Sequence, residues 1–195
     1  MRKNAEKIEY TLIRSARRSI GLEITPEGEL LVRAPRFASK SQIEALIWEK
    51  ADWIARARAR AAARTEAAEA AGALTPEELK ALAARAKAVL PERIAHFAAL
   101  LGVDYGRVTI RAQRTRWGSC SAQGNLNFNC LLMLTPPEII DSVVAHELCH
   151  RLYMDHSPAF YDALTRVCPD YKACRAWLKE HGPVLLARVR AADDE

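Results

Sequence analysis

The sequence contains no run of apolar residues long enough to cross a membrane. A transmembrane helix needs about 18 or more apolar residues in succession, and the first ten residues, MRKNAEKIEY, are charged and carry no apolar leader segment. The 195 residues are 50% hydrophobic, which is enough to build one compact unit or two small ones around a core. We therefore expect a cytoplasmic protein without a membrane partner.

Paired cysteines and phosphate-binding loops are also absent. The five cysteines include no C-x-x-C pair, so we expect free thiols rather than a disulfide framework. No Gly-rich loop suited to phosphate and no carboxylate cluster suited to magnesium is visible. These absences weigh against a nucleotide-hydrolysing enzyme of the usual kinds.

The chain is basic, with a net charge of +5 and an isoelectric point near 9.1. Such a charge permits contact with nucleic acid, and several arginines gather in residues 14–36. No motif with interleaved aromatic residues accompanies them, so a solvated basic face is the better interpretation. Nucleic-acid contact stays open without a motif to support it, and no feature of the sequence specifies an oligomeric state.

A mostly apolar segment over residues 139–153 predicts a helix that is buried on most sides. Thr135 and Glu138 have the spacing of a capping box, and the two prolines between them suit a first turn, where N–H groups have no helical partner. The sequence therefore predicts a well-marked helix start near Thr135, in the core of its domain.

This segment carries the pattern His-Glu-x-x-His, formed by His146, Glu147 and His150. At about 100° per residue the two histidines lie one turn apart on one face, so both imidazoles can reach a single ion. A tetrahedral catalytic zinc takes a third protein ligand and keeps one position for water. His156 is the best third ligand. We expect one zinc ion per chain, although buried structural histidines remain the alternative interpretation.

His156 can reach the metal only if the helix ends soon after His150, because a continuing helix would carry it to another face. The sequence provides the break: Asp155 tolerates a turn, Pro158 disfavours helical geometry at the preceding residue, and Ser157 can cap a new helix. A glutamate ligand is the rival arrangement, but no glutamate stands about twenty residues past His150. His156 is therefore expected in an elbow between two helices.

Three segments of this half of the chain resemble the YgjP-like metallopeptidases, distant relatives of SprT-like and WLM zinc peptidases. They are residues 116–120 (RWGSC), 135–150 and 155–160, and the resemblance extends upstream, so that it covers roughly residues 8–182. The resemblance implies an α+β fold in which a zincin-like metallopeptidase domain places a central HExxH helix beside a small sheet. Because the family-like RWGSC run precedes the zinc helix, we also expect residues 117–120 and 125–130 to wall the zinc cleft, with Trp117 among the substrate-binding residues.

The first part of the chain predicts a separate region. Apolar residues alternate in three runs between residues 8 and 34, which fits three antiparallel strands followed by a helix. Residues 56–72 contain no bulky apolar side chain, so a boundary near Gly72 is plausible. We expect an N-terminal antiparallel β-sheet with a long helix over residues 1–72 and a zincin-like catalytic domain over residues 73–195.

Residues 108–111 and 126–130 are expected to form strands beside the zinc helix. By analogy with other zinc peptidases, in which an edge strand pairs with the extended substrate, residues 125–129 are a candidate substrate rail. The polar face of this segment comprises Asn125, Asn127 and Asn129. The alternative interpretation is that these asparagines form an ordinary solvent-exposed face.

We interpret the chain as a zinc-dependent metallopeptidase that cleaves peptides or unfolded protein. Glu147 would act as general base and accept a proton from the water that zinc activates. Sequence does not choose an oxyanion-stabilising residue among Arg151, Tyr153, Tyr161 and His181. Two alternatives stay open. One is a zinc-dependent nucleotide phosphohydrolase with Arg114 and Arg116 as phosphate clamps, and the other is a non-enzymatic zinc-stabilised interaction module whose fourth ligand is Cys120 or Cys149.

Overall fold

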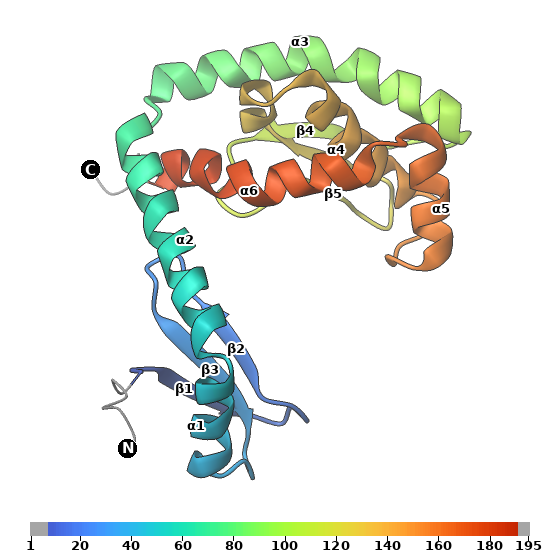
Figure 1. The fold of residues 1–195 in the computed structure, drawn as a ribbon. Helices are drawn as coiled ribbons and strands as arrows, with labels where there is room; N and C mark the ends of the chain where they lie inside the picture. The colour runs from blue at the N-terminus through green and yellow to red at the C-terminus, as the bar shows by residue number, and fades with distance from the viewer. Residues whose placement is uncertain (1–7, 191–195) are drawn as a thin grey trace. The chain divides into compact units, whose positions relative to one another are not determined.

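The computed structural model describes residues 8–190 and has a mixed α+β architecture (Figure 1). The chain divides into two compact units between Ala70 and Ala71. Each unit has its own buried apolar cluster, and the two clusters share no residue. That these units are independent domains with the boundary near Gly72 remains a proposal.

The first unit contains a sheet of β1 (Thr11–Ser15), β2 (Gly21–Ile24) and β3 (Leu30–Pro35) in the order β1-β3-β2. β2 and β3 form an antiparallel hairpin, whereas β1 pairs with β3 in parallel. The expectation of an all-antiparallel sheet is therefore wrong. β3 buries most of its apolar side chains and is the central strand. β1, which is exposed at every position, pairs with the edge of β3 that β2 leaves free and runs in the same direction as β3.

Two helices follow this sheet, α1 (Lys40–Glu49) and α2 (Ala51–Ala71). Ser39 and Gln42 form the capping box that starts α1. Ile43 and Ile47 of α1 and Ile54 of α2 are buried in one apolar cluster with side chains of β3. From residue 56 onward α2 is rich in alanine and arginine and has no apolar stripe, and apart from Ala61 its residues are exposed or half-buried.

The second unit begins with the long helix α3 (Pro76–Leu101), which Thr75 and Glu78 cap at its start. Gly102 ends the helix in the left-handed conformation, with a φ of 64°, and donates its N–H to carbonyls of the last turn. Pro91 does not break the helix, although a proline in the interior removes one backbone hydrogen bond.

A second three-stranded sheet follows, made of β4 (Val108–Arg111), β5 (Gly118–Cys120) and β6 (Leu126–Asn129) in the order β4-β6-β5. β6 pairs in parallel with β4 and antiparallel with β5. The edge-strand premise for residues 125–129 is therefore wrong, because both sides of β6 are paired. Leu126 and Phe128 are buried, which explains why β6 occupies the centre.

After β6 the chain forms a short 3-10 helix, η1 (Cys130–Leu134), and then α4 (Pro137–Cys149). The predicted capping box is wrong: the Thr135 hydroxyl donates to the carbonyl of Leu132 and so closes η1, and no side chain caps α4. α4 ends at Cys149, earlier than residue 153. It contacts α3, β5, α5 (Pro158–Val167) and α6 (Tyr171–Arg190), and is therefore surrounded on several sides.

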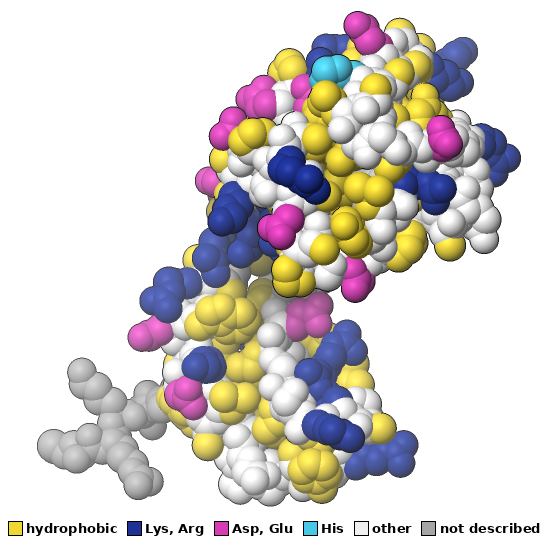
Figure 2. Space-filling model, turned by 90° about the vertical axis from the view of Figure 1, so that its right-hand side faces the viewer, with side chains coloured by type: hydrophobic (Ala, Val, Ile, Leu, Met, Phe, Trp, Pro, Cys, Tyr) yellow, Lys and Arg dark blue, Asp and Glu magenta, His cyan; other side chains and the backbone are white. Residues whose placement is uncertain are grey.

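Charged side chains lie interspersed with apolar ones on the surface. On the face shown in Figure 2, Lys and Arg side chains are scattered among acidic and apolar groups of both units. Within residues 8–190, no helix combines the length and apolar character that a membrane span requires.

Candidate metal centre

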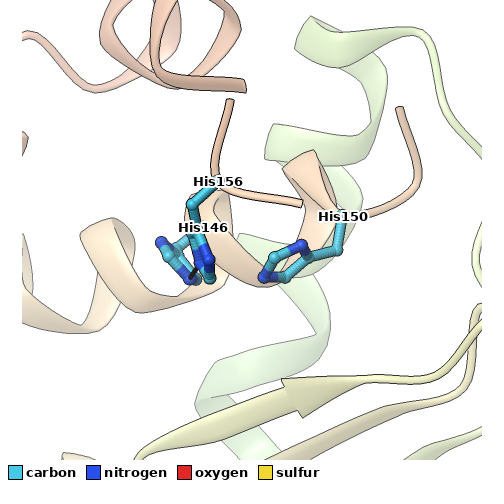
Figure 3. A group of neighbouring side chains, drawn as sticks. All are labelled: His146, His150 and His156. Carbon is cyan, nitrogen blue, oxygen red and sulfur yellow. Dashed lines mark hydrogen bonds between the residues drawn. The ribbon is translucent and has the colours of Figure 1, made fainter. Parts of the chain in front are cut away.

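Two histidines come from the end of α4 and the third from the turn that follows. His146 lies in the last turn of α4, and His150 is the residue at which the helix ends. His156 precedes Ser157, whose side chain caps α5 by accepting from the backbone N–H of Phe160. The short connection between α4 and α5 therefore returns the chain to the face that His146 and His150 occupy (Figure 3).

The three imidazoles converge on one point. The Nε2 atoms of His146 and His156 approach to 3.2 Å, and one ring nitrogen from each of the three histidines lies within 4.8 Å of the others. The buried ring of Phe160 contacts all three, with centroid distances of 5.0, 4.8 and 4.9 Å to His146, His150 and His156. This apolar ring holds the imidazoles from one side.

Hydrogen bonds to the other ring nitrogens fix the orientation of two of these imidazoles. The Tyr171 hydroxyl lies 3.2 Å from Nδ1 of His146, and Nδ1 of His150 lies 3.1 Å from the backbone carbonyl of Tyr153. A bond at Nδ1 leaves Nε2 as the ligand atom, which is the arrangement found around histidine-bound metals. The donor set fits a zinc ion with three imidazole ligands and an open position.

Burial favours the neutral form of the His146 and His150 rings, which is the form that binds a metal. Burial, with smaller contributions from His150, His156 and Arg175, lowers the pKa of His146 to about 4. Burial also lowers the pKa of His150. Both rings therefore carry a free electron pair at neutral pH.

Glu147 is nearly buried, with 7% of its surface exposed, and points toward β5. A Cβ atom at Gly118 would lie 2.7 Å from Cγ and 2.8 Å from Oε1 of Glu147, so only glycine allows this close approach. Burial raises the pKa of Glu147 to about 7, and Arg116 opposes the rise. The carboxyl group is thus poised to gain or lose a proton near neutral pH.

Glu147 and His146 line a cavity of about 220 Å³, and Trp117 and Gly118 line the same cavity. Tyr171 and Arg175 of α6 line it from another side. Trp117 is partly buried and packs closely against Gly182. The predicted cleft residues Trp117 and Gly118 therefore lie beside Glu147.

The three asparagines of the predicted rail do not line this cavity. Asn129 is fully buried, and its side chain donates to the carbonyls of Gln113 and Arg116 and accepts from the N–H of Leu131. The Asn125 side chain accepts from the N–H of Arg107. Asn127 is half-buried in the central strand. Asn125 and Asn129 therefore hold loops at the two ends of β6.

Sequence reasoning missed Tyr171 and Arg175, because α6 reaches the site from 25 residues beyond His146 and carries no recognisable motif. Among the oxyanion candidates, Arg151 donates instead to the carbonyls of Asp104 and Ala122. His181 stacks on Trp177. Tyr171, an aromatic residue at the start of a helix, is a signal in the sequence, but a weak one.

The cysteines named as alternative ligands stand apart from the histidine group. Cys149 is fully buried in the apolar core, and burial raises its pKa to about 12. Cys120 is half-buried in β5, and its pKa is raised by burial and by the Glu147 carboxylate. In the part of the chain that the structure describes, the potential metal ligands that cluster are the three histidines without a cysteine.

Comparison with known proteins gives a family match over this unit. A model described as the YgjP-like metallopeptidase domain matches residues 76–181. The crystal structure of the zymogen of Pyrococcus abyssi abylysin, a metallopeptidase, is similar over 46% of this chain and 91% of its own, with 20% identity and a TM-score of 0.43. The zymogen of Methanocaldococcus jannaschii jannalysin covers 45% and 93%, with 15% identity and a TM-score of 0.39. No curated protein matches the sequence.

The family match is sufficient to assign the chain to a family, because it covers more than half of the 195 residues. A metallopeptidase is a hydrolase, and zinc is the metal that such enzymes typically use. The chain belongs to the YgjP-like metallopeptidase family and is a zinc metallopeptidase.

Proposed function

We propose that the chain cleaves peptide bonds with one zinc ion held by His146, His150 and His156. The observation that carries the proposal is the convergence of three imidazoles, with ring nitrogens within 4.8 Å of one another, beside a buried carboxyl group. When bound, zinc supplies Lewis acidity, which lowers the pKa of water and polarises the scissile carbonyl. Three protein ligands leave room for water and substrate.

Glu147 is the general base of the proposed reaction. It accepts a proton from the attacking water and delivers it to the leaving amine. A base works best when its pKa lies near the working pH, and burial brings the pKa of Glu147 to about 7. The close contact with Gly118 restricts the carboxyl group to one side of the cavity.

The substrate backbone is proposed to run along β5 rather than β6. Within the described residues β5 pairs on one side only, with β6, and Gly118 of β5 adjoins Glu147. An extended peptide can add a strand to such a free edge through main-chain hydrogen bonds. This mode suits peptides and unfolded protein, whose backbones are available for pairing.

The test of the proposed base is Glu147→Gln in the zinc-loaded protein. The substitution keeps the size of the side chain but removes its ability to take a proton, so turnover of an unfolded protein should fall at least about a hundredfold. Zinc content should stay near that of the wild type. Glu92→Gln, an exposed position on α3, is the control and should leave both quantities unchanged.

Parallel loss of zinc and activity in Glu147→Gln would make this residue a ligand or a support for one, and normal turnover would refute the mechanism. The same wild-type preparation should be assayed on nucleoside triphosphates. Hydrolysis of those, without cleavage of unfolded protein, would favour a phosphohydrolase. Zinc binding with neither activity would favour an interaction module.

A further inference from the structure

A second cavity, of about 710 Å³, lies between α5 and α6 beside the metal centre. Tyr161 and Thr165 line it from α5, and α6 contributes mainly Tyr171, Lys172, Arg175 and Lys179. Tyr171 and Arg175 also line the smaller cavity that holds Glu147. The two cavities therefore share these two side chains, and we call the larger one the α5–α6 groove.

All charged side chains that line the α5–α6 groove are cationic. Lys172, Arg175 and Lys179 are spaced by three and four residues, so they project from one face of α6. Within residues 8–190 these three form no salt bridge. Asp170, at the start of the helix, interacts with Cys168 and Cys174 and does not line the groove.

Two of these cations lie near the positive end of their own helix, which disfavours them. Lys172 lies in the first turn of α6 and Arg175 directly after it, and the first turn contains no acidic residue. The positive end of a helix dipole stabilises anions and disfavours cations. Local helix stability therefore does not explain this placement, whereas binding of an external anion does, because the helix end and the cations then act together.

The walls of the groove suit part of a peptide. The rings of Tyr161 and Tyr171 lie 6.2 Å apart, and Tyr161 is also 6.2 Å from the ring of His156. The tyrosines provide flat apolar surface for the aliphatic part of a side chain. Arg175 can bind a carboxylate through two parallel N–H groups, and the lysines add positive charge.

We propose that the α5–α6 groove is a substrate subsite that binds an acidic side chain of the peptide close to the scissile bond. The proposal rests on the peptidase function proposed above and names its substrate class. Arg175 reaches the carboxylate from the end nearest Glu147, while Lys172 and Lys179 attract it electrostatically. Because the lining of the subsite is cationic, the enzyme prefers acidic segments of unfolded protein.

The test measures binding to the zinc-loaded Glu147→Gln protein, in which turnover does not interfere. Fluorescent, amidated peptides of neutral sequence carry one glutamate at successive positions, each matched by a peptide with glutamine there. At one or two positions the glutamate peptide should bind at least about fivefold more tightly, as expected for a few partly exposed charge pairs. This preference should shrink as salt is added.

The charge-reversed variant Lys179→Glu, made in the same protein, should lose the preference for glutamate and favour a lysine peptide. Lys87→Glu is the matched control, since Lys87 is exposed on α3 and lines neither cavity. An equal effect of both substitutions would assign the preference to overall charge and overturn the subsite. Equal affinity for all glutamate and glutamine pairs would overturn it too.

Two further arms separate the sources of failure. Peptides with a free C-terminal carboxylate are compared with their amides, and a preference that follows the terminus alone would contradict recognition of a side chain. Wild-type protein is assayed for cleavage of the same series. Cleavage without discrimination would overturn the subsite alone, whereas discrimination in binding without cleavage of any peptide would overturn the proposed function and leave an anion-binding groove.

Discussion

At the scale of single residues, Tyr171 is the link between α6 and the proposed metal site. Its hydroxyl is 3.2 Å from Nδ1 of His146 and so determines which ring nitrogen faces the metal. Groups that hold a metal ligand in this way typically contribute a factor of about 10 to 100 in metal affinity. Tyr171 is therefore a positioning residue, which acts on the proposed metal site through His146.

Tyr171→Phe should weaken zinc binding about tenfold or more, because the ring remains and only the hydroxyl is lost. Competition with a chromophoric chelator measures the zinc dissociation constant. Tyr153→Phe is the matched control, since His150 bonds to the backbone carbonyl of Tyr153 and not to its hydroxyl. The positioning role would be disproved by equal zinc affinity in both variants.

Gly118→Ala tests the contact that places Glu147. The added Cβ would lie 2.7 Å from Cγ of Glu147, and Gly118 does not have a positive φ, so the effect is steric rather than conformational. Displacement of the Glu147 carboxyl group should lower kcat/KM for an unfolded protein at least about tenfold, because a small misplacement of a catalytic group strongly reduces the rate. Zinc content should be retained.

Ser119→Ala serves as the control for Gly118→Ala, because alternate residues of a strand point to opposite faces and Ser119 is on the same strand. Full activity of Gly118→Ala would mean that Glu147 moves freely or is not the base. Loss of zinc in the same variant would indicate damage to the metal site instead.

At the scale of elements, the correctly predicted features are those that residues adjacent in the sequence determine. The helix that bears His146 and His150, and the cap at Ser157 that starts α5, follow from neighbouring residues and are present. The helix does start near Thr135, but its capping box was wrong because the Thr135 hydroxyl bonds to η1, an element that apolar periodicity does not reveal. Sheet order and the contribution of α6 depend on distant packing, which local patterns do not encode.

The end of β6 provides a prediction about stability. Asn129 is fully buried and bonds to Gln113, Arg116 and Leu131, so its loss leaves several buried polar groups without partners. Asn129→Ala should lower the free energy of unfolding by about 2–4 kcal/mol. Chemical denaturation measures this quantity.

Asn127→Ala is the comparison for Asn129→Ala. The Oδ1 atom of Asn127 is buried and has no hydrogen-bond partner among the described residues, so its removal should cost clearly less. A larger loss of stability for Asn127→Ala than for Asn129→Ala would contradict the structural role of Asn129.

At the scale of the whole molecule, the proposed chemistry lies in the second unit. The three histidines, Glu147 and both cavities belong to residues after Ala70, and the family match spans residues 76–181. The apolar cluster of the first unit contains no residue beyond Ile54. We propose that residues 73–195 form a domain that folds by itself.

The isolated fragment 73–195 should unfold in one cooperative transition and bind about one zinc ion, because its core and its metal ligands are complete without the first unit. Circular dichroism and metal analysis of the fragment check both points. A fragment that stays unfolded in the presence of zinc would show that the first unit is required for folding.

X-ray absorption at the zinc edge of the loaded wild-type chain shows whether three imidazoles hold zinc and leave one position open. We expect a four-coordinate ion with nitrogen and oxygen neighbours at about 2.0–2.1 Å and no sulfur. His156→Ala should lose most of the bound zinc. A sulfur neighbour at about 2.3 Å would place Cys120 or another thiol on the metal, close the fourth position and contradict a site with three imidazoles and an open position.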